Sequence, residues 1–302
     1  SPVHCYAKAL ELDPLFAKAW TNLGSAGGCY VSGSFIPQAE CYVKALELDP
    51  TDAIAWSHLG TLGGGTISGS RSTDVDCYVR SLELEPSSFA WTNLGAAGGG
   101  MVLGVSMTQV DCFAKAIEVD PSCALAWSNF GNVGGGVVAG VHMTKAACYI
   151  NAVELRPDHA SAWCNLGNEG GGNVSDRFMA SADCYIKALE LNPDDAGAWS
   201  NLGGVGGGIV CGRCMRQDDC FAKALEIHLK QFNKTSFHNE REHYGDSRHN
   251  RHNSSNSVEP IDLAIAWTNL GIAGGGTVSG EYTDELECYT KALEIEPSYS
   301  QA

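Results

Sequence analysis

A polar side chain recurs two residues after each of the seven tryptophans, as asparagine in six positions and histidine in one. A side-chain amide offers two N–H donors and a carbonyl acceptor, so a row of amides can pair with the main chain of an extended peptide whatever its side chains. The same groups can instead bond within or between elements of the protein itself, and both interpretations stay open. We call this set the amide ladder: Asn22, His58, Asn93, Asn129, Asn165, Asn201 and Asn269.

The chain carries no pattern that predicts a metal, a cofactor or catalysis. Cys211 and Cys214 form the single Cys-x-x-Cys, followed by Cys220 and His228. A structural zinc site requires two such pairs, or cysteines and histidines at fixed spacing, and neither is present. No serine or cysteine stands beside a base in an arrangement unique to one place. We therefore predict no catalytic residue, no metal and no cofactor, and a protein that is not an enzyme.

Runs of three glycines also recur along the chain, and they invite comparison with phosphate-binding loops. Such a loop needs a preceding strand and a following Gly-Lys-Ser/Thr, and neither is expected here. We therefore attribute the glycines to loop formation and close helix packing. The runs stand at 63–65, 98–100, 134–136, 170–172, 206–208 and 274–276, with Gly27-Gly28-Cys29 as the first copy.

The charge balance narrows the class of partner. The chain has 19 Lys and Arg against 35 Asp and Glu, a net charge of −16. A negative field repels phosphate backbones and anionic headgroups, which argues against nucleic acid and membrane partners. A neutral or basic extended peptide fits better. We interpret most glutamates of the recurring Lys-Ala-Leu-Glu phrase as a solvated outer face.

Thirteen cysteines occur, and their spacing argues against a disulfide framework. Eight of them precede an aromatic residue in one repeated phrase, which places them at one recurring helix position as small buried hydrophobes. A reducing compartment follows as the simpler interpretation, with the cytoplasm expected and the nucleus also possible. The eight are Cys5, Cys41, Cys77, Cys112, Cys148, Cys184, Cys220 and Cys288.

The elements that position these residues come from an internal repeat. The phrase Ala-Trp-x-Asn-Leu-Gly recurs every 35 or 36 residues, with a last gap of 68, and Cys-aromatic-x-Lys-Ala-Leu-Glu follows 21 residues after each Trp. The spacing of apolar residues predicts two short helices per repeat. The first ends near the glycines, and a loop pinned by a β-branched residue such as Val102 follows. The second begins at a cap such as Thr108 with Asp111 and ends before a proline.

These helix pairs define the expected organisation. Residues 1–227 hold one unaccompanied second helix and then repeats that begin near residues 16, 52, 87, 123, 159 and 195. Residues 228–258 are rich in His, Asn and Ser and are expected to be a disordered insertion that interrupts a second helix. Residues 259–302 form the final repeat. The chain starts and stops at a second helix, so we expect it to be a segment of a longer array.

The repeat resembles the tetratricopeptide (TPR) family, with Sel-type repeats as near relatives. The resemblance implies an all-α, right-handed solenoid with a period of about 36 residues. The unit is two residues longer than the usual TPR, and glycines replace an aromatic late in the first helix. The matching positions in two copies are Trp56, Leu59, Gly60, Tyr78, Ser81 and Pro86, and Trp267, Leu270, Gly271, Tyr289, Ala292 and Pro297.

The resemblance also implies where function lies. In O-GlcNAc transferases the TPR superhelix carries asparagines at the ladder position, where they face a concave groove and grip an extended peptide. The sequence is thus predicted to form a non-catalytic scaffold for protein–protein interaction. The alternative is the recognition arm of an O-GlcNAc-type glycosyltransferase whose catalytic region lies outside this chain. The lysine and arginine clamp of chaperone-tail-binding TPR domains is missing, so an acidic C-terminal tail is not the expected ligand.

Overall fold

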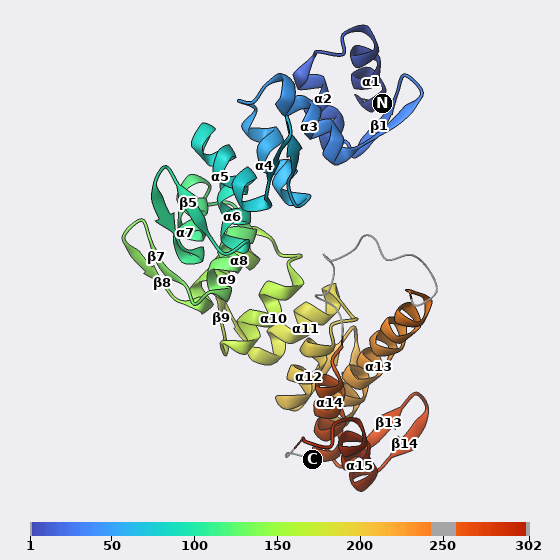
Figure 1. Ribbon diagram of the computed structural model, residues 1–302. Coiled ribbons are helices and arrows are strands. Elements are labelled where there is room, and N and C mark those ends of the chain that lie inside the picture. Colours follow the sequence, from blue (N-terminus) through green and yellow to red (C-terminus); the bar gives the residue numbers. More distant parts are fainter. Residues whose placement is uncertain (1, 243–257, 300–302) are drawn as a thin grey trace. The chain divides into compact units, whose positions relative to one another are not determined.

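The computed structural model describes residues 2–242 and 258–299 of the chain. Throughout this part of the chain, two helices are followed by a short antiparallel strand pair, and this order repeats (Figure 1). The chain divides into two compact units, residues 1–155 (unit 1) and 156–302 (unit 2). Within each unit consecutive helices contact one another, as expected for a mainly helical repeat architecture.

Unit 1 contains four complete helix pairs after one unaccompanied helix. The first helix of each pair carries the tryptophan and spans nine residues, and the second helix spans eleven. The first helices are α2 (Ala17–Ser25), α4 (Ala53–Thr61), α6 (Ser88–Ala96) and α8 (Ala124–Asn132). The second helices are α3 (Gln38–Leu48), α5 (Asp74–Leu84), α7 (Gln109–Val119) and α9 (Lys145–Leu155), with α1 (Pro2–Leu12) before them.

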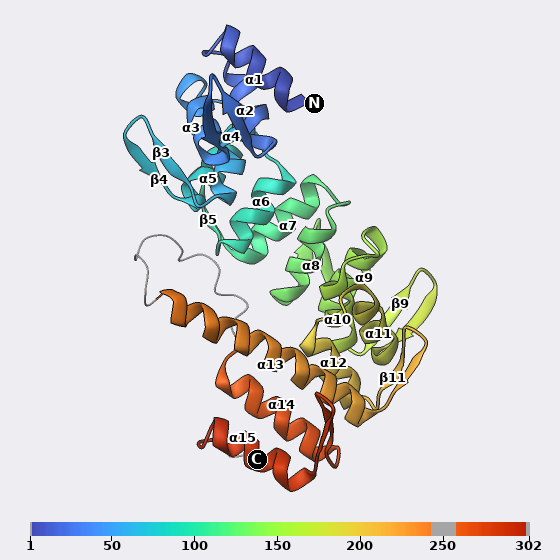
Figure 2. The ribbon, with the colours of Figure 1, turned by 90° about the vertical axis from the view of Figure 1, so that its right-hand side faces the viewer.

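Unit 2 repeats this arrangement in three pairs. The first helices are α10 (Ala160–Asn168), α12 (Ala196–Gly204) and α14 (Pro260–Ile272), and the second helices are α11 (Ser181–Leu191), α13 (Gln217–Glu242) and α15 (Glu285–Ile295). Helix α13 continues through residue 228, where we expected a disordered insertion to interrupt it, and it contacts α14 (Figure 2). Leu229 and Phe232 join the core around α14, which explains the continuation. Residues 243–257 of the expected insertion lie outside the described part of the chain.

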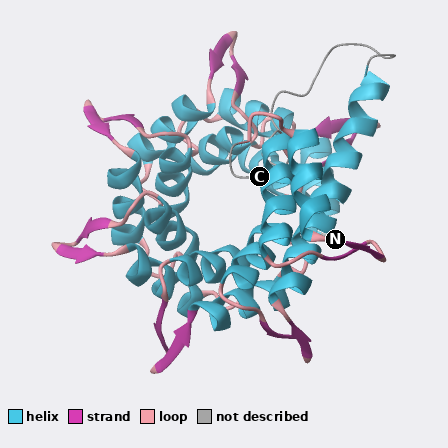
Figure 3. Ribbon diagram, turned by 90° about the horizontal axis from the view of Figure 1, so that it is seen from below, coloured by secondary structure: helices cyan, strands magenta, loops and turns pink. Residues whose placement is uncertain are grey.

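The chain is mainly helical, as expected, but the connection inside each pair is a β-hairpin and not the expected loop. Each hairpin is a separate antiparallel two-stranded sheet that projects from its helix pair (Figure 3). In unit 1 the strands are β1 (Gly28–Val31) with β2 (Ser34–Pro37), β3 (Gly65–Ile67) with β4 (Ser70–Ser72), β5 (Gly100–Val102) with β6 (Val105–Met107), and β7 (Gly136–Val138) with β8 (Val141–Met143). In unit 2 they are β9 (Gly171–Val174) with β10 (Arg177–Ala180), β11 (Gly208–Val210) with β12 (Arg213–Met215), and β13 (Gly276–Val278) with β14 (Glu281–Thr283).

A two-residue turn closes every hairpin. In the pair β5–β6, Val102 faces Val105, and Leu103 and Gly104 lie between them with φ of +49° and +77°. Positive φ at both central residues is the requirement of a type I′ turn, whose twist matches that of paired strands. The β-branched residue before the turn is buried, as expected of an anchor, in five pairs and only half-buried in the other two: Val31, Val102, Val138, Val210 and Val278 are buried, and Ile67 and Val174 are half-buried.

Each helix pair closes at a glycine four residues after the tryptophan. In α12 this is Gly203, and a Cβ placed there would lie 2.8 Å from Cε1 of Phe221 in α13. The equivalent distance to the aromatic ring is 2.5–2.8 Å in every pair. The aromatic ring therefore packs directly on the glycine, and the two helices approach more closely than an alanine would permit.

Neighbouring pairs are joined by polar contacts as well as by the core. The indole Nε1 of Trp127 donates to the carbonyl oxygen of Pro121 at 2.9 Å, and four other tryptophans bond the proline six residues before them in the same way. Glu47 of α3 accepts from the backbone N–H of Ser68, in the hairpin turn of the next pair, at 3.3 Å. Glu118 and Glu226 accept equivalent bonds, so these glutamates do more than form a solvated face.

The recurring cysteine is buried in seven second helices but exposed in α1, where the expectation of a buried Cys5 was wrong, so the seven buried thiols are expected to resist alkylation in the folded protein. Burial raises the pKa of these thiols to about 11 or about 12, so the reactive thiolate is scarce at neutral pH. Iodoacetamide labelling followed by mass spectrometry should modify the exposed Cys5, Cys211 and Cys214 first. Equal rates at buried and exposed positions would contradict this packing. The protected cysteines are Cys41, Cys77, Cys112, Cys148, Cys184, Cys220 and Cys288.

Candidate peptide-binding surface

The amide ladder occupies one position on the first helices, two residues after the tryptophan of each helix. All seven of its side chains are half-buried. Half-burial leaves polar atoms within reach of a ligand while the helix holds them in place. Unit 1 contributes Asn22, His58, Asn93 and Asn129, and unit 2 contributes Asn165, Asn201 and Asn269.

In unit 1 the amides make few contacts with the protein. Asn93 donates from Nδ2 to the carbonyl oxygen of Phe89 at 2.9 Å, one turn earlier in α6. This bond uses one of its donors and leaves the side-chain oxygen for another partner. Among residues 2–242 and 258–299, no group forms a hydrogen bond with the side-chain amide of Asn22 or Asn129.

His58 takes the ladder position of α4 and sits among aromatic rings. Its ring is stacked on Tyr42 of α3 with centroids 5.7 Å apart, and it lies 5.0 Å from the ring of Phe89 in α6. These contacts connect three helices of unit 1, α3, α4 and α6. The aromatic environment suits an uncharged imidazole.

In unit 2 two ladder amides bond to neighbouring helices instead. Asn201 of α12 donates from Nδ2 to Oδ1 of Asn168 in α10 at 2.9 Å, and the hydroxyl of Tyr185 donates to the same oxygen at 3.0 Å. Asn269 of α14 donates to Oγ of Ser200 at 3.3 Å. The structural interpretation of the ladder therefore describes these two positions.

His58 also predicts a pH dependence of stability. Burial lowers its pKa, and the nearby Asp52 carboxylate opposes this only in part. The unfolded chain then binds the proton more tightly than the folded chain does. The contribution of neutral His58 to the free energy of unfolding is therefore fully present above the ordinary pKa of 6.5, and it is lost as the pH falls toward the folded-state pKa. His58→Asn should therefore reduce the loss of stability on acidification, as measured by urea unfolding on either side of this range. An unchanged pH dependence would contradict the burial of a neutral His58.

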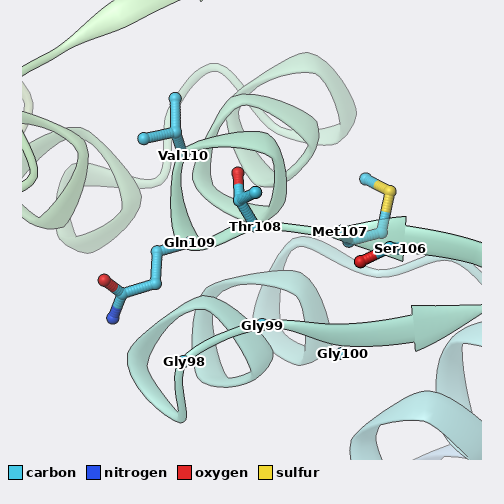
Figure 4. Close-up of a pocket in the computed structure, with 8 residues that line it drawn as sticks. All are labelled: Gly98, Gly99, Gly100, Ser106, Met107, Thr108, Gln109 and Val110. Atoms are coloured by element: carbon cyan, nitrogen blue, oxygen red, sulfur yellow. The ribbon is translucent and has the colours of Figure 1, made fainter.

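A hollow on unit 1 lies at the base of a hairpin. Figure 4 shows Gly98, Gly99 and Gly100 along one side of this pocket, facing residues 106–110 at the end of β6 and the start of α7. Two of its polar side chains already have partners, because Thr108 bonds with Asp111 and Gln109 donates to the carbonyl oxygen of Gly95 at 3.2 Å. We therefore assign this pocket to the junction of hairpin and helix.

Three exposed apolar residues that flank the ladder were not expected from the sequence. Ile54, Phe89 and Leu125 stand two residues before the tryptophan of α4, α6 and α8, and all three are exposed. The sequence does contain a signal for them, because three successive repeats carry an apolar residue at this position. The residue type at this position differs from one repeat to the next, so the position does not stand out as a repeated residue.

The described part of the chain holds no group of three or more His, Cys, Asp and Glu side chains placed to ligate a metal ion. None of the helices in residues 2–242 and 258–299 is both long and apolar enough to cross a membrane.

No model of a known protein family matches this chain. No curated protein matches its sequence.

Proposed function

We propose that this protein is a non-catalytic scaffold that binds an extended peptide along the first helices of unit 1. The observation that carries the proposal is the state of the ladder there. Asn22 and Asn129 keep their full hydrogen-bonding capacity, and Asn93 keeps its acceptor. A half-buried amide in a fixed place pairs with a peptide group at little cost in side-chain entropy.

The architecture supports this use of the surface. Helix pairs of the TPR kind, stacked in a right-handed solenoid with a period of about 36 residues, bring equivalent positions of successive first helices into one row. Within unit 1, α4 contacts α6 and α6 contacts α8, which keeps such a row continuous. The negative net charge favours a neutral or basic peptide. Thirteen free cysteines suit a reducing compartment such as the cytoplasm or nucleus.

The test compares two positions of the same ladder. The full chain is screened against random peptides displayed on phage, and the affinity of selected peptides is then measured for variants. The double variant Asn93→Ala and Asn129→Ala should lose about tenfold or more in affinity, because two main-chain contacts vanish. Its circular dichroism should match the unchanged protein.

Asn201→Ala provides the matched control in unit 2. It removes the bond to Asn168 and should lower the free energy of unfolding by about 1 kcal/mol. Affinity for the selected peptides should change little. If no peptide is selected, or if the unit 1 double variant binds as well as the unchanged protein, the proposed function is wrong.

A further inference from the structure

An apolar side chain is exposed in the first turn of three successive first helices of unit 1. Ile54 of α4, Phe89 of α6 and Leu125 of α8 are 47%, 44% and 45% exposed. We call these three the apolar row. Single exposed apolar residues are ordinary, but three at one repeated position, on first helices that contact one another, require a cause.

The apolar row lies directly beside the ladder. Each of its members precedes the ladder residue of its own helix by four positions, and residues four apart share a helix face. The amide of Asn93 reaches the backbone of Phe89 at 2.9 Å, and the rings of Phe89 and His58 are 5.0 Å apart. A peptide held by the ladder therefore lies within reach of the apolar row.

A carboxylate stands in the turn before each of the same three helices. Asp49, Glu85 and Asp120 precede the apolar residues by four or five positions, and we call them the acidic row. None of the three forms an ion pair with any described residue. Bonds from Thr51 and Ser122 lower the pKa of Asp49 and Asp120, so both stay ionised at neutral pH.

Unit 2 has the same fold without these two rows. The position of the apolar row is Ser161 in α10 and Gly197 in α12, and the position of the acidic row is Arg156 and Asn192. Only α14 regains an apolar residue there, Ile265. Helix packing does not require either row, because α10 and α12 form without them. The rows therefore have a cause other than the fold.

We propose that the apolar and acidic rows of unit 1 bind a polyproline II segment with an apolar side chain at every third position and basic side chains between them. This inference rests on the proposed function and names the chemistry of its ligand. Polyproline II rises 3.1 Å per residue with three residues per turn, about 9 Å per turn. Helices in contact lie about 8–10 Å apart, so each turn of the peptide meets one first helix.

The three surface features divide the recognition among them. Every third side chain packs on Ile54, Phe89 or Leu125, and lysine or arginine side chains meet the acidic row. A polyproline II main chain has no internal hydrogen bonds, so its peptide groups are free to bond with Asn93 and Asn129. Aromatic-lined surfaces recognise such segments because their conformation is set before binding.

The probe for the test is a labelled synthetic peptide that repeats Leu-Pro-Lys, measured by fluorescence anisotropy with the full chain. Two matched peptides repeat Ser-Pro-Lys, without the apolar side chains, and Leu-Pro-Glu, with the charge reversed. We expect Leu-Pro-Lys to bind at least about tenfold more tightly than either. Equal affinity of all three peptides would overturn the proposal without need of any protein variant.

Two sets of protein variants test the rows themselves. Ile54→Ser, Phe89→Ser and Leu125→Ser combined should weaken Leu-Pro-Lys about tenfold or more, and Ser161 shows that this position tolerates serine. Asp49→Asn, Glu85→Gln and Asp120→Asn combined should reduce the salt dependence of binding. Unchanged binding by the folded serine variant would contradict the apolar row. If randomly selected peptides need the ladder but Leu-Pro-Lys does not bind, this inference fails while the proposed function stands.

Discussion

Gly99→Ala should destabilise the protein by about 3 kcal/mol, the largest effect that we expect from one methyl group here. Gly99 has a φ of +91°, which an alanine adopts only with strain. Its new Cβ would also overlap the carbonyl oxygen of Met107, on the opposite strand of the hairpin. Because this oxygen is a backbone atom and a Cβ has a fixed position, no side-chain rotation relieves the overlap. Urea unfolding followed by circular dichroism measures the change.

Gly98→Ala is the matched control for this prediction. Gly98 has a φ of +108°, but no atom lies within 4 Å of a Cβ built there. The substitution should cost only the conformational strain, about 1–2 kcal/mol. A loss at Gly98 equal to that at Gly99 would show that the hairpin does not return onto the glycine run as described.

Gly203→Ala should lower the free energy of unfolding by about 1–2 kcal/mol, whereas Gly204→Ala should leave it unchanged or raise it by up to about 1 kcal/mol. The two glycines are neighbours in α12. A Cβ at Gly203 would press on the ring of Phe221, but one at Gly204 meets no atom within 4 Å. Alanine is otherwise the better helix former, so Gly204 reports the propensity alone.

A second substitution checks the cause of the Gly203 effect. Phe221→Leu removes the ring edge that the new methyl group meets, at the cost of a poorly filled core. The double variant of Gly203→Ala and Phe221→Leu should lose less stability than the sum of the two single losses, because the new methyl group no longer meets the ring edge. Strict additivity would mean that the ring and the glycine are not in contact.

Much of the helical framework follows from local sequence signals. The caps Thr73 with Asp76 and Thr108 with Asp111 form the expected reciprocal hydrogen bonds. Helix α3 ends at Leu48, before Pro50, and helix α7 ends at Val119, before Pro121. Capping and proline geometry act within a few residues, so they can be identified without knowledge of the tertiary structure.

The hairpins escaped prediction because their signal is short. Strands of three or four residues give too few positions for a period of two to stand out. The informative pair was the turn itself, such as Leu103-Gly104 between Val102 and Val105, whose glycine accepts positive φ. The preceding glycine run drew the interpretation toward a loop instead.

The use of each ladder amide was equally hidden from the sequence. Asn201 is bound within the protein because Asn168 of the preceding first helix stands opposite it. In unit 1 the residue that corresponds to Asn168 in the preceding first helix is a different one. Such pairings join residues 33 positions apart and depend on how helices face each other. Repetition of the motif therefore predicted the position of the amides but not their partners.

Photo-crosslinking of a bound peptide tests the central claim most directly. A peptide selected from the random library carries a photoreactive group at its centre, and mass spectrometry locates the adducts on the full chain. We predict adducts on α4, α6 and α8, which disappear in the Asn93→Ala and Asn129→Ala variant. Adducts confined to the hairpins or to unit 2, and unaffected by that variant, would contradict a peptide-binding surface on the first helices of unit 1.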